Sequence, residues 1–371
     1  MSETALPAPA TASRWDTASE ARLTWLRFRR HKLAMASLVV MALLVLAAVF
    51  AEAVAPFDPA KSNGRLTFFP PQSIQWTGDD GFHPYVLGSR LQRDPVTLAP
   101  RFVPDPGRHI RLGLFVHGDP YLLWGLIPGD VHLFGPTDPS QPVFLLGADR
   151  LGRDLLSRIV FGARASLSVG LVGVTCSLVL GVLFGGLSGY FGGRVDWTVQ
   201  RVIEFILSLP TIPIWLALAA SLPKTWSPIA VYFTITLIIS LIGWTELARV
   251  IRGRFLALRH ETYVTAAWLD GCSRSRVIFR HMLPALTSHI IAAVTLAIPL
   301  MILAETSLSF LGLGLQPPAI SWGSLLQEAQ SVSTVATAPW LLLPGVAVAL
   351  VVLCLNFLGD GLRDAADPHG H

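Results

Sequence analysis

Charged side chains at the edges of long apolar runs are the residues of this chain whose types and spacing could do chemistry. Arg201 and Glu204 are three residues apart, and so are Glu246 and Arg249. At this spacing, opposite charges lie on one face of a helix and can neutralise each other. Ionisable residues within a membrane are costly and are mostly functional. Both pairs are therefore candidates for gating contacts or for structural pairing, and Glu305, which ends an apolar run, could face a translocation path or the headgroup layer.

No set of side chains in the sequence predicts catalysis. Ser307 and Ser309 are the nearest nucleophiles to Glu305, and no histidine lies near them in sequence. The Gly-x4-Gly-Lys-Ser/Thr loop that cradles nucleotide phosphates is absent, so we expect no ATP hydrolysis by this chain and no cofactor. The three cysteines are far apart, which argues against a disulfide framework. Histidines without ligand spacing are expected at the surface rather than around a metal: His83, His109, His117 and His132.

The stretch 261–284 has the pattern of a helix, a turn and a second helix. Good helix formers come first, Gly271 can adopt the left-handed conformation that ends a helix, and Ser273 can cap the next one. The small side chains of Ala266 and Ala267 would let another surface approach closely. A short exposed helix with such a face is typical of helices that dock in the groove of another protein.

The composition indicates that much of this chain faces lipid. Of its 371 residues, 52% are hydrophobic and only 14% are charged, whereas soluble domains carry about 25% charged residues. A helix needs about 20 apolar residues to cross a bilayer, and Pro210 and Pro213 predict a kink in the third of the candidate spans. The six uncharged stretches that qualify are 33–51, 165–193, 205–223, 225–245, 282–304 and a stretch within 329–359 that begins near Pro339.

The distribution of basic residues predicts the orientation of these spans, because cytoplasmic segments carry an excess of Lys and Arg. The N-terminal arm and the segment between the fourth and fifth spans are rich in arginine, so both termini are expected inside the cell. Residues 150–164 depart from this pattern, since they hold four arginines on the expected outer side. The prolines, the scattered aromatics and the strand-like run 109–118 predict a small, irregular, partly β region over 56–146.

The stretch 263–284 resembles the EAA loop of ABC importer permeases. It keeps the spacing of the Ala-Ala, Gly and Leu-Pro elements of that loop, and it carries Thr265 where the loop has Glu. The resemblance implies that the short helix is a coupling helix, which sits in a cleft of a cytoplasmic ATPase and transmits nucleotide-driven motion to the spans. The residues that it assigns to coupling are Thr265, Ala266, Ala267, Gly271, Arg280 and Pro284.

Other stretches are similar to the permeases of dipeptide, oligopeptide and nickel importers, and to the second of their two permease types. This likeness covers about 145–365 and includes the runs 146–154, 189–193, 305–314 and 321–323. It implies an all-α membrane protein with six transmembrane helices of the type I ABC importer permease fold. The partly β region would then be a periplasmic insertion between helices 1 and 2.

The resemblance and the hydropathy together predict how the chain is organised in a bacterial inner membrane. The expected parts are a cytoplasmic arm 1–32, a first transmembrane helix 33–55, a periplasmic insertion 56–146, a permease core 147–359 with a cytoplasmic coupling loop 249–284, and a cytoplasmic tail 360–371. The expected partners are a sibling permease subunit, two cytoplasmic ABC ATPase subunits, a periplasmic substrate-binding protein and membrane lipid. A net charge of only +4 gives no reason to expect a nucleic acid.

The function that the resemblance implies is that of a permease subunit that moves di- or oligopeptides inward by alternating access, driven by ATP that its partners hydrolyse. Within that interpretation, the substrate stays open among short peptides, nickel chelates, peptide antibiotics and glycosides. A stand-alone secondary transporter or channel is the alternative, although such folds often show internal repeats and none is evident. A membrane enzyme is a third class, which lacks a nucleophile and base at suitable positions.

Overall fold

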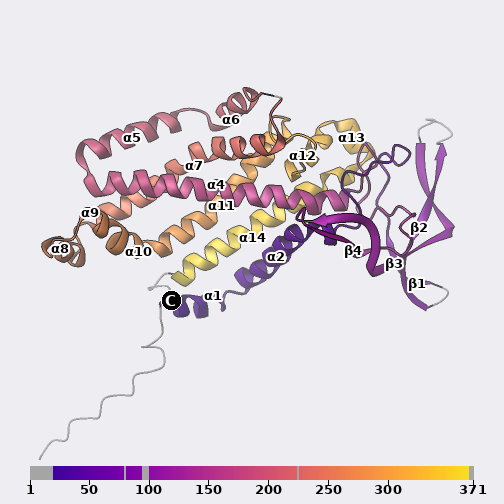
Figure 1. Cartoon of the computed structure of the whole chain (residues 1–371), viewed down its shortest axis with the longest axis horizontal. Helices are drawn as coiled ribbons and strands as arrows, with labels where there is room; N and C mark the ends of the chain where they lie inside the picture. Colours follow the sequence, from indigo (N-terminus) through magenta and orange to yellow (C-terminus); the bar gives the residue numbers. More distant parts are fainter. Residues whose placement is uncertain (1–19, 79–80, 94–99, 224, 367–371) are drawn as a thin grey trace, which may run out of the picture.

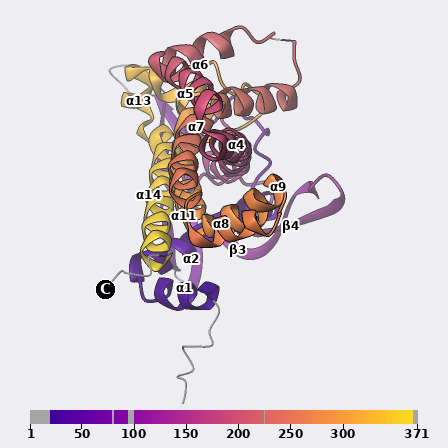
Figure 2. The same cartoon turned by 90° about the vertical axis from the view of Figure 1, so that its left-hand side faces the viewer.

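The molecule is a long bundle of helices with a β sheet at one end (Figure 1). A computed structural model of the protein describes residues 20–78, 81–93, 100–223 and 225–366. The first 19 residues of the predicted arm and the last five of the predicted tail lie outside these ranges. Helix α1 (Glu20–Phe28) and the end of α14 (Leu343–Ala366) lie toward the same end of the bundle as α8 (Thr262–Leu269), away from the sheet (Figures 1 and 2).

Within the described residues, five helices are long and apolar enough to cross a membrane, judged by length and composition alone. Each overlaps one of the predicted uncharged runs, although the ends differ by several residues. Helix α7 continues well past residue 245 because buried positions recur at helical spacing, at Leu247, Ile251 and Phe255. The five helices are α2 (Lys32–Val49), α4 (Leu155–Phe191), α7 (Pro228–Leu258), α11 (Thr287–Phe310) and α14.

The predicted third span is a pair of helices, α5 (Gly193–Ser208) and α6 (Thr211–Ala220), which meet at an angle of 82°. Leu209 has an extended backbone, with φ −90° and ψ 137°, which is the conformation favoured before a proline. Pro210 has no N–H with which to continue the first helix. The predicted break is confirmed and is sharper than a kink within one helix, so the pair is a sixth span only if both helices cross the membrane together.

The predicted fifth span begins later than residue 282, because the loop before it is not a continuous helix. Leu283 donates its N–H to the carbonyl of Ile278, five residues earlier. Pro284 has no N–H, and its ring crowds the carbonyl four residues before it, so the preceding turn widens. The elements that lead into α11 are α9 (Arg274–Arg276), the π-helix η1 (Val277–Met282) and α10 (Leu283–Ala285).

Glycines on α4 allow α4 and α7 to pack closely. A Cβ atom on Gly185 would lie 2.5 Å from the carbonyl oxygen of Ala248, and one on Gly189 would lie 2.5 Å from Cβ of Phe255. Gly181 lies one turn earlier on the same face and meets Leu247. Small residues at a helix interface let the two backbones approach in this way.

The chain between α3 (Ala51–Val54) and α4 forms four antiparallel strands that lie side by side in chain order. The strand-like run 109–118 lies within β3. Val86, Ile110 and Val143 form a small core under this sheet. The strands are β1 (Ile74–Gly78), β2 (Gly81–Arg93), β3 (Pro100–Leu123) and β4 (Ile127–Pro136).

One of the histidines expected at the surface, His132, is buried instead. Its ring nitrogens lie 2.5 Å from the carbonyl oxygen of Ala55 and 2.9 Å from that of Asp119. The imidazole therefore ties β4 to the end of α3, which the spacing of histidines in the sequence cannot indicate. In the part of the chain that the structure describes, no group of three or more His, Cys, Asp or Glu could hold a metal ion.

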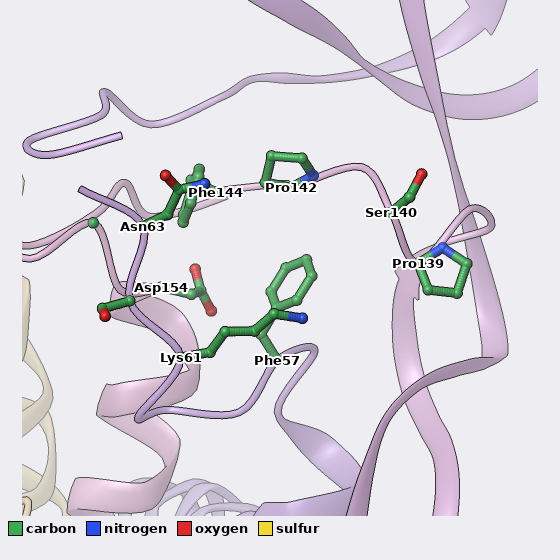
Figure 3. A pocket seen from close by; sticks show the side chains of 10 residues that line it. Phe57, Lys61, Asn63, Pro139, Ser140, Pro142, Phe144 and Asp154 are labelled. Atoms are coloured by element: carbon green, nitrogen blue, oxygen red, sulfur yellow. The ribbon is translucent and has the colours of Figure 1, made fainter. Parts of the chain in front are cut away.

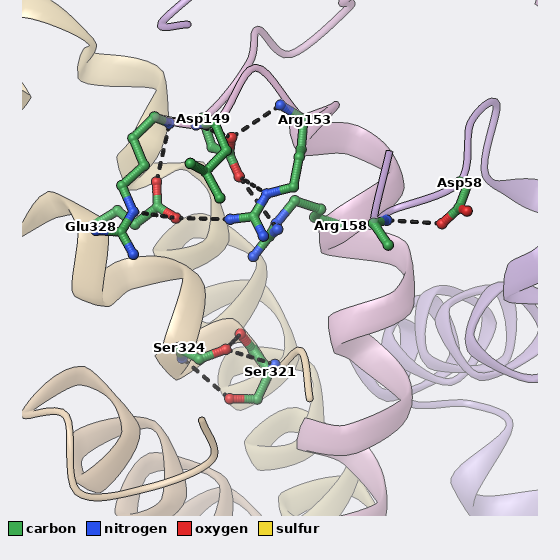
Figure 4. Close-up of polar contacts among 10 residues, drawn as sticks. Asp58, Asp149, Arg153, Arg158, Ser321, Ser324 and Glu328 are labelled. Atoms are coloured by element: carbon green, nitrogen blue, oxygen red, sulfur yellow. Dashed lines mark hydrogen bonds and ion pairs between the residues drawn. The ribbon is translucent and has the colours of Figure 1, made fainter. Parts of the chain in front are cut away.

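Short elements connect α11 to α14 at the sheet end of the bundle. Ser321 and Ser324 form a capping box at the start of the first of them (Figure 4). The next residue after the cap, Trp322, is buried and donates its indole N–H to the carbonyl of Ile159 on α4 at 2.9 Å. The elements are α12 (Trp322–Leu326), η2 (Gln327–Gln330), α13 (Val332–Thr337) and η3 (Pro339–Leu342).

Candidate functional site

Helix α8 lies at the end of the bundle farthest from the β sheet (Figures 1 and 2). Val264 and Ala267 on its inner side pack with Phe255, Val277 and Met282, which come from α7 and η1. Isolated helices shorter than about 12–15 residues are marginal in water. This small core therefore holds the short helix in place.

The opposite side of α8 is exposed, and we call Thr265, Ala266 and Leu269 the outer face of α8. Leu269 is 84% exposed, and the other two are also exposed. An open cleft of about 290 Å³ lies beside this helix and reaches Arg259. Leu269 and Trp268, which is 55% exposed, both line this cleft, and exposed apolar residues grouped in this way mark a candidate contact site for another protein.

Ala267 does not belong to the outer face, contrary to the expectation from sequence. Its exposed fraction is 6%. Consecutive residues of a helix are about 100° apart, so Ala266 and Ala267 cannot both lie at the centre of one exposed face. Ala267 helps to anchor the helix, whereas Ala266 is accessible, as are Arg280 and Pro284 farther along the loop.

Gly271 ends α8 in the left-handed conformation, with φ +74°. Its N–H donates to the carbonyl of Trp268, and the N–H of Cys272 donates to that of Ala267. This pair of bonds is the Schellman arrangement, so the predicted role of the glycine is confirmed. Ser273 does precede α9 as its N-cap residue, but its side chain makes no cap hydrogen bond.

Two polar contacts connect the α8 end of the bundle to the long helices. Trp268 donates its indole N–H to the hydroxyl of Tyr190 at the end of α4, at 3.1 Å. Arg252 of α7 binds Asp196 of α5 through two nitrogens, and Ser188 of α4 donates to the same carboxylate. Displacement of α8 would therefore reach α4 directly and α5 through α7.

The two charged pairs predicted from sequence differ in the structure. Arg201 Nη1 lies 2.8 Å from Glu204 Oε2, in a pair whose side chains are both more than half exposed. Glu246 and Arg249 are also exposed, and no ion pair between them is found among the described residues, so structural pairing is not seen for these two residues and a gating contact stays a prediction. An exposed ion pair stabilises by only about 0–1 kcal/mol, so the presence of the first pair and the absence of the second change the stability of the protein little.

Glu305 lies inside the protein, and neither expected setting, an open path or the headgroup layer, fits its position. Its side chain is fully buried. Ser309 Oγ donates to it at 2.7 Å and Ser166 Oγ lies 3.3 Å away, while Ser166 also accepts the backbone N–H of Trp322. The carboxyl group thus connects α11, α4 and α12. Glu305 does not end its helix, because α11 continues past it to Phe310.

The arginines of 150–164, which break the expected charge pattern, are matched by acidic residues. Asp149 lies 2.6 Å from Arg153 and 3.3 Å from Arg158, and Glu328 lies 3.3 Å from Arg153 (Figure 4). Glu328 also lies 3.7 Å from Arg150. Such pairing offsets part of the charge of the cluster, so the number of arginines alone overstates its positive charge.

A second arginine–acid contact lies at the end of the first long helix. Arg164 of α4 binds Glu52 at 2.6 Å and donates to the carbonyls of Ala48 and Val49. These carbonyls end α2 and have no partner within the helix. The guanidinium of Arg164 therefore both neutralises Glu52 and caps the end of α2.

A pocket of about 160 Å³ lies between the sheet region and the start of α4 (Figure 3). Asp154, at the N-cap of α4, points into it beside Phe57, Lys61 and Asn63. Ser157 donates to one carboxylate oxygen through its N–H and its hydroxyl, at 2.8 and 2.6 Å, and the other oxygen has no hydrogen-bond partner. Burial raises the pKa of the Asp154 carboxyl from 3.8 to about 6, because the ionised form loses its water.

Sequence reasoning missed several residues that shape these sites. Leu269 forms part of the accessible side of α8, and the hydrogen bond between Trp268 and Tyr190 holds the helix in place. The large apolar residues at the end of a short loop helix were the signal in the sequence that could have indicated a contact surface. The Asp149–Glu328 arrangement could not be found from sequence, because its members are far apart along the chain.

Comparison with known proteins shows which families and structures this chain is similar to. Residues 181–369 match the family described as binding-protein-dependent transport system inner membrane component, and residues 19–71 match the N-terminal TM domain of oligopeptide transport permease C. Structures of the MetNI methionine ABC transporter in inward-facing conformations cover 56% of this chain and 96% of their own, with 16% identity and a TM-score of 0.44.

Named relatives share more of the sequence. The oligopeptide transport system permease protein OppC of Haemophilus influenzae is 39% identical over 240 residues, which is 64% of this chain and 75% of that protein. The dipeptide transport system permease protein DppC of Bacillus subtilis is 38% identical over 62% of this chain and 70% of its own length. OppC of Bacillus subtilis is 28% identical over 98% of this chain and 95% of its own.

The structure and these matches define a mainly helical membrane transport component with several apolar helices. The chain belongs to the family of inner membrane components of binding-protein-dependent transport systems. The resemblance stated from sequence is confirmed, and the chain is a permease of an ABC importer and a transport component, not an enzyme.

Proposed function

We propose that this permease carries di- or oligopeptides inward, as one of two different permease subunits, and that the outer face of α8 receives a cytoplasmic ATPase subunit. The peptide substrate is supported by the names of the oligopeptide and dipeptide permeases that the chain resembles. The ATPase contact is supported above all by Leu269, which projects into solvent from a helix that is anchored on its other side.

The proposed topology has six spans, with α5 and α6 crossing as a pair, and both termini in the cytoplasm. The position of α8, α1 and the end of α14 away from the sheet supports it (Figure 1). The sheet would then lie in the periplasm as the insertion 56–146, between the first helix 33–55 and the core 147–359. The arm 1–32, the coupling loop 249–284 and the tail 360–371 would lie inside.

Transport in this proposal proceeds by alternating access. A periplasmic binding protein delivers the peptide to a cavity between this subunit and its sibling. When two partner ATPases close on ATP, they displace α8, and the Schellman turn at Gly271 lets the helix move as a unit with the π-helical segment behind it. The contacts of Trp268 with Tyr190 and of Arg252 with Asp196 pass this displacement to α4 and α5.

The coupling surface can be tested by purification of the chain from its native membrane in mild detergent. Leu269→Asp places a charge on the outer face and should abolish recovery of ATPase subunits and ATPase activity. Val332→Asp, at an equally exposed valine (85%) of α13, near the opposite end of the bundle, is the matched control and should retain both. Retention of the ATPases by Leu269→Asp at normal membrane levels would contradict the proposal. Transport by the purified chain without any ATPase subunit would instead identify it as a secondary transporter or channel.

The substrate class needs a separate experiment. Cells that lack the chain should lose uptake of a labelled tripeptide and keep uptake of a labelled amino acid. A loss confined to a nickel chelate or to a glycoside would replace peptides as the substrate and leave the coupling proposal unaffected.

A further inference from the structure

The turn that joins β3 to β4 carries a large apolar surface. Residues 121–128 are uncharged and read Tyr-Leu-Leu-Trp-Gly-Leu-Ile-Pro. Leu126 is 79% exposed, Leu122 57% and Ile127 54%. The only hydroxyl in the run, that of Tyr121, donates to the carbonyl of Val131. A contiguous exposed apolar patch of this kind indicates an interaction surface.

The backbone of this turn holds a tryptophan in an unusual conformation. Leu126 donates its N–H to Leu123, and the two residues between them, Trp124 and Gly125, have φ of +53° and +72°. Positive φ at both central positions is typical of a type I′ hairpin turn, which favours Asn, Asp or Gly at the first of them. A bulky residue there is uncommon. Backbone strain of this kind clusters at functional positions.

The indole of Trp124 marks the end of the first long helix. Its N–H donates to the carbonyl oxygen of Val49 at 2.8 Å, and its ring lies 5.6 Å from that of Phe50. Val49 is the last residue of α2, and the ion pair between Arg164 and Glu52 lies at the same helix end. Tryptophan and charged side chains together at the end of an apolar helix are typical of the boundary between lipid and water.

The patch on the turn continues the exposed apolar surface of α2. Leu43, Leu46 and Phe50 of that helix end are exposed large apolar residues, and strands β3 and β4 both pack against α3, which follows it. We propose that the β3–β4 turn inserts Leu122, Leu126 and Ile127 into the outer leaflet of the bilayer, beside the first span. The occupant of this surface is lipid, because the patch carries no charged side chain, its polar side-chain groups are bonded within the protein, and it adjoins the lipid-facing side of a membrane helix.

A spin label can locate the turn relative to the bilayer. In the transporter purified with its partners, Cys176, Cys272 and Cys354 are replaced by alanine, and a nitroxide is attached at Leu126→Cys or, as a matched control, at His83→Cys. His83 is exposed on β2, a strand at the end of the molecule away from the helix bundle (Figure 1). After reconstitution in vesicles of phosphatidylethanolamine and phosphatidylglycerol, collisions with oxygen and with a water-soluble nickel chelate are compared.

The label at position 126 should collide more with oxygen than with the nickel chelate, and this ratio should be reversed at position 83. Equal access of the nickel chelate to both labels would place the turn in water and overturn the proposal. Low access of both reagents at position 126 would show that a sibling subunit or a binding protein covers the turn, and would also overturn it.

A second measurement needs no cysteine replacement. In vesicles that contain brominated phosphatidylcholine, Trp124→Phe should remove part of the lipid-dependent quenching of tryptophan fluorescence. Unchanged quenching in this variant would contradict insertion of the turn. Neither result depends on which substrate or ATPase the transporter uses, so failure here would leave the proposed function intact.

Discussion

Arg252 of α7 and Asp196 of α5 form a two-point ion pair, with Nε 2.5 Å from Oδ1 and Nη2 2.6 Å from Oδ2. Ser188 of α4 donates to the same carboxylate. Three long helices therefore meet at one carboxylate, near the end of the bundle that carries α8. The side chains are 30% and 18% exposed, so water screens the pair only in part.

Arg252→Lys should lower the thermal stability of the purified protein, because an ammonium group keeps the charge and cannot reproduce the two-point geometry. We expect a loss of about 1–3 kcal/mol in the free energy of unfolding. The control is Arg201→Lys, whose pair with Glu204 is exposed and should contribute less than about 1 kcal/mol. Equal midpoints in a thermal unfolding scan for both variants would show that the two-point geometry of the Arg252–Asp196 pair does not add to the stability of the protein.

Gly185→Ala should destabilise the bundle, because the added Cβ would lie 2.5 Å from the backbone oxygen of Ala248 and would force α4 away from α7. Overpacking of this kind costs about 1–3 kcal/mol. The matched control is Gly253→Ala on α7, where a Cβ meets no atom within 4 Å. There the higher helix propensity of alanine should stabilise by up to about 1 kcal/mol. Opposite shifts of the unfolding temperature are the expected result, and shifts of the same sign would argue against this packing.

Gly271→Arg should block transport while the chain still inserts into the membrane. The backbone at this position has φ +74°, and a left-handed conformation costs a non-glycine residue about 1–2 kcal/mol. The substitution also adds a long charged side chain beside the outer face of α8. Uptake is measured in cells with wild-type levels of the variant in their membranes, and Gly271→Ala separates the backbone effect from that of the charge. Normal uptake by Gly271→Arg would remove this turn from the mechanism.

Asp154 should make the protein less stable as the pH rises. Its pKa in the folded protein, about 6, lies above the ordinary value of 3.8. Folding therefore favours the protonated carboxyl, so the contribution of this group to stability is fully present below about pH 4 and is lost as the pH rises through 6. A shift of about two units corresponds to about 3 kcal/mol.

The measurement for Asp154 is the unfolding temperature of wild type and of Asp154→Asn between about pH 4 and pH 8. Asparagine keeps an oxygen that accepts a hydrogen bond from Ser157 and carries no charge. The unfolding temperature of Asp154→Asn should therefore decline less with rising pH than that of wild type. Asp138→Asn, at an exposed carboxyl with a lowered pKa, should not flatten the decline. Parallel curves for wild type and Asp154→Asn would show that this carboxyl is already ionised at low pH.

Local patterns in the sequence were sufficient for features that depend on a few neighbouring residues. Gly271 could be assigned a left-handed backbone because helix ends require it, and Pro210 could be assigned a break because proline lacks an N–H. Features that depend on residues far apart were not predictable. The burial of His132 and that of Glu305 are examples, because each depends on what other segments place around the side chain.

By itself, the sequence determined that the chain has several membrane helices, that α8 ends at Gly271, and to which family the chain belongs, because apolar run length, backbone preference and residue spacing are local properties. Tertiary structure decided which faces of those elements are available. It turned Ala267 inward and left Leu269 in solvent, matched the arginines near Asp149 with a glutamate from residue 328, and placed Trp124 against the end of α2. Those outcomes depend on packing between distant segments, which no local pattern of residues specifies.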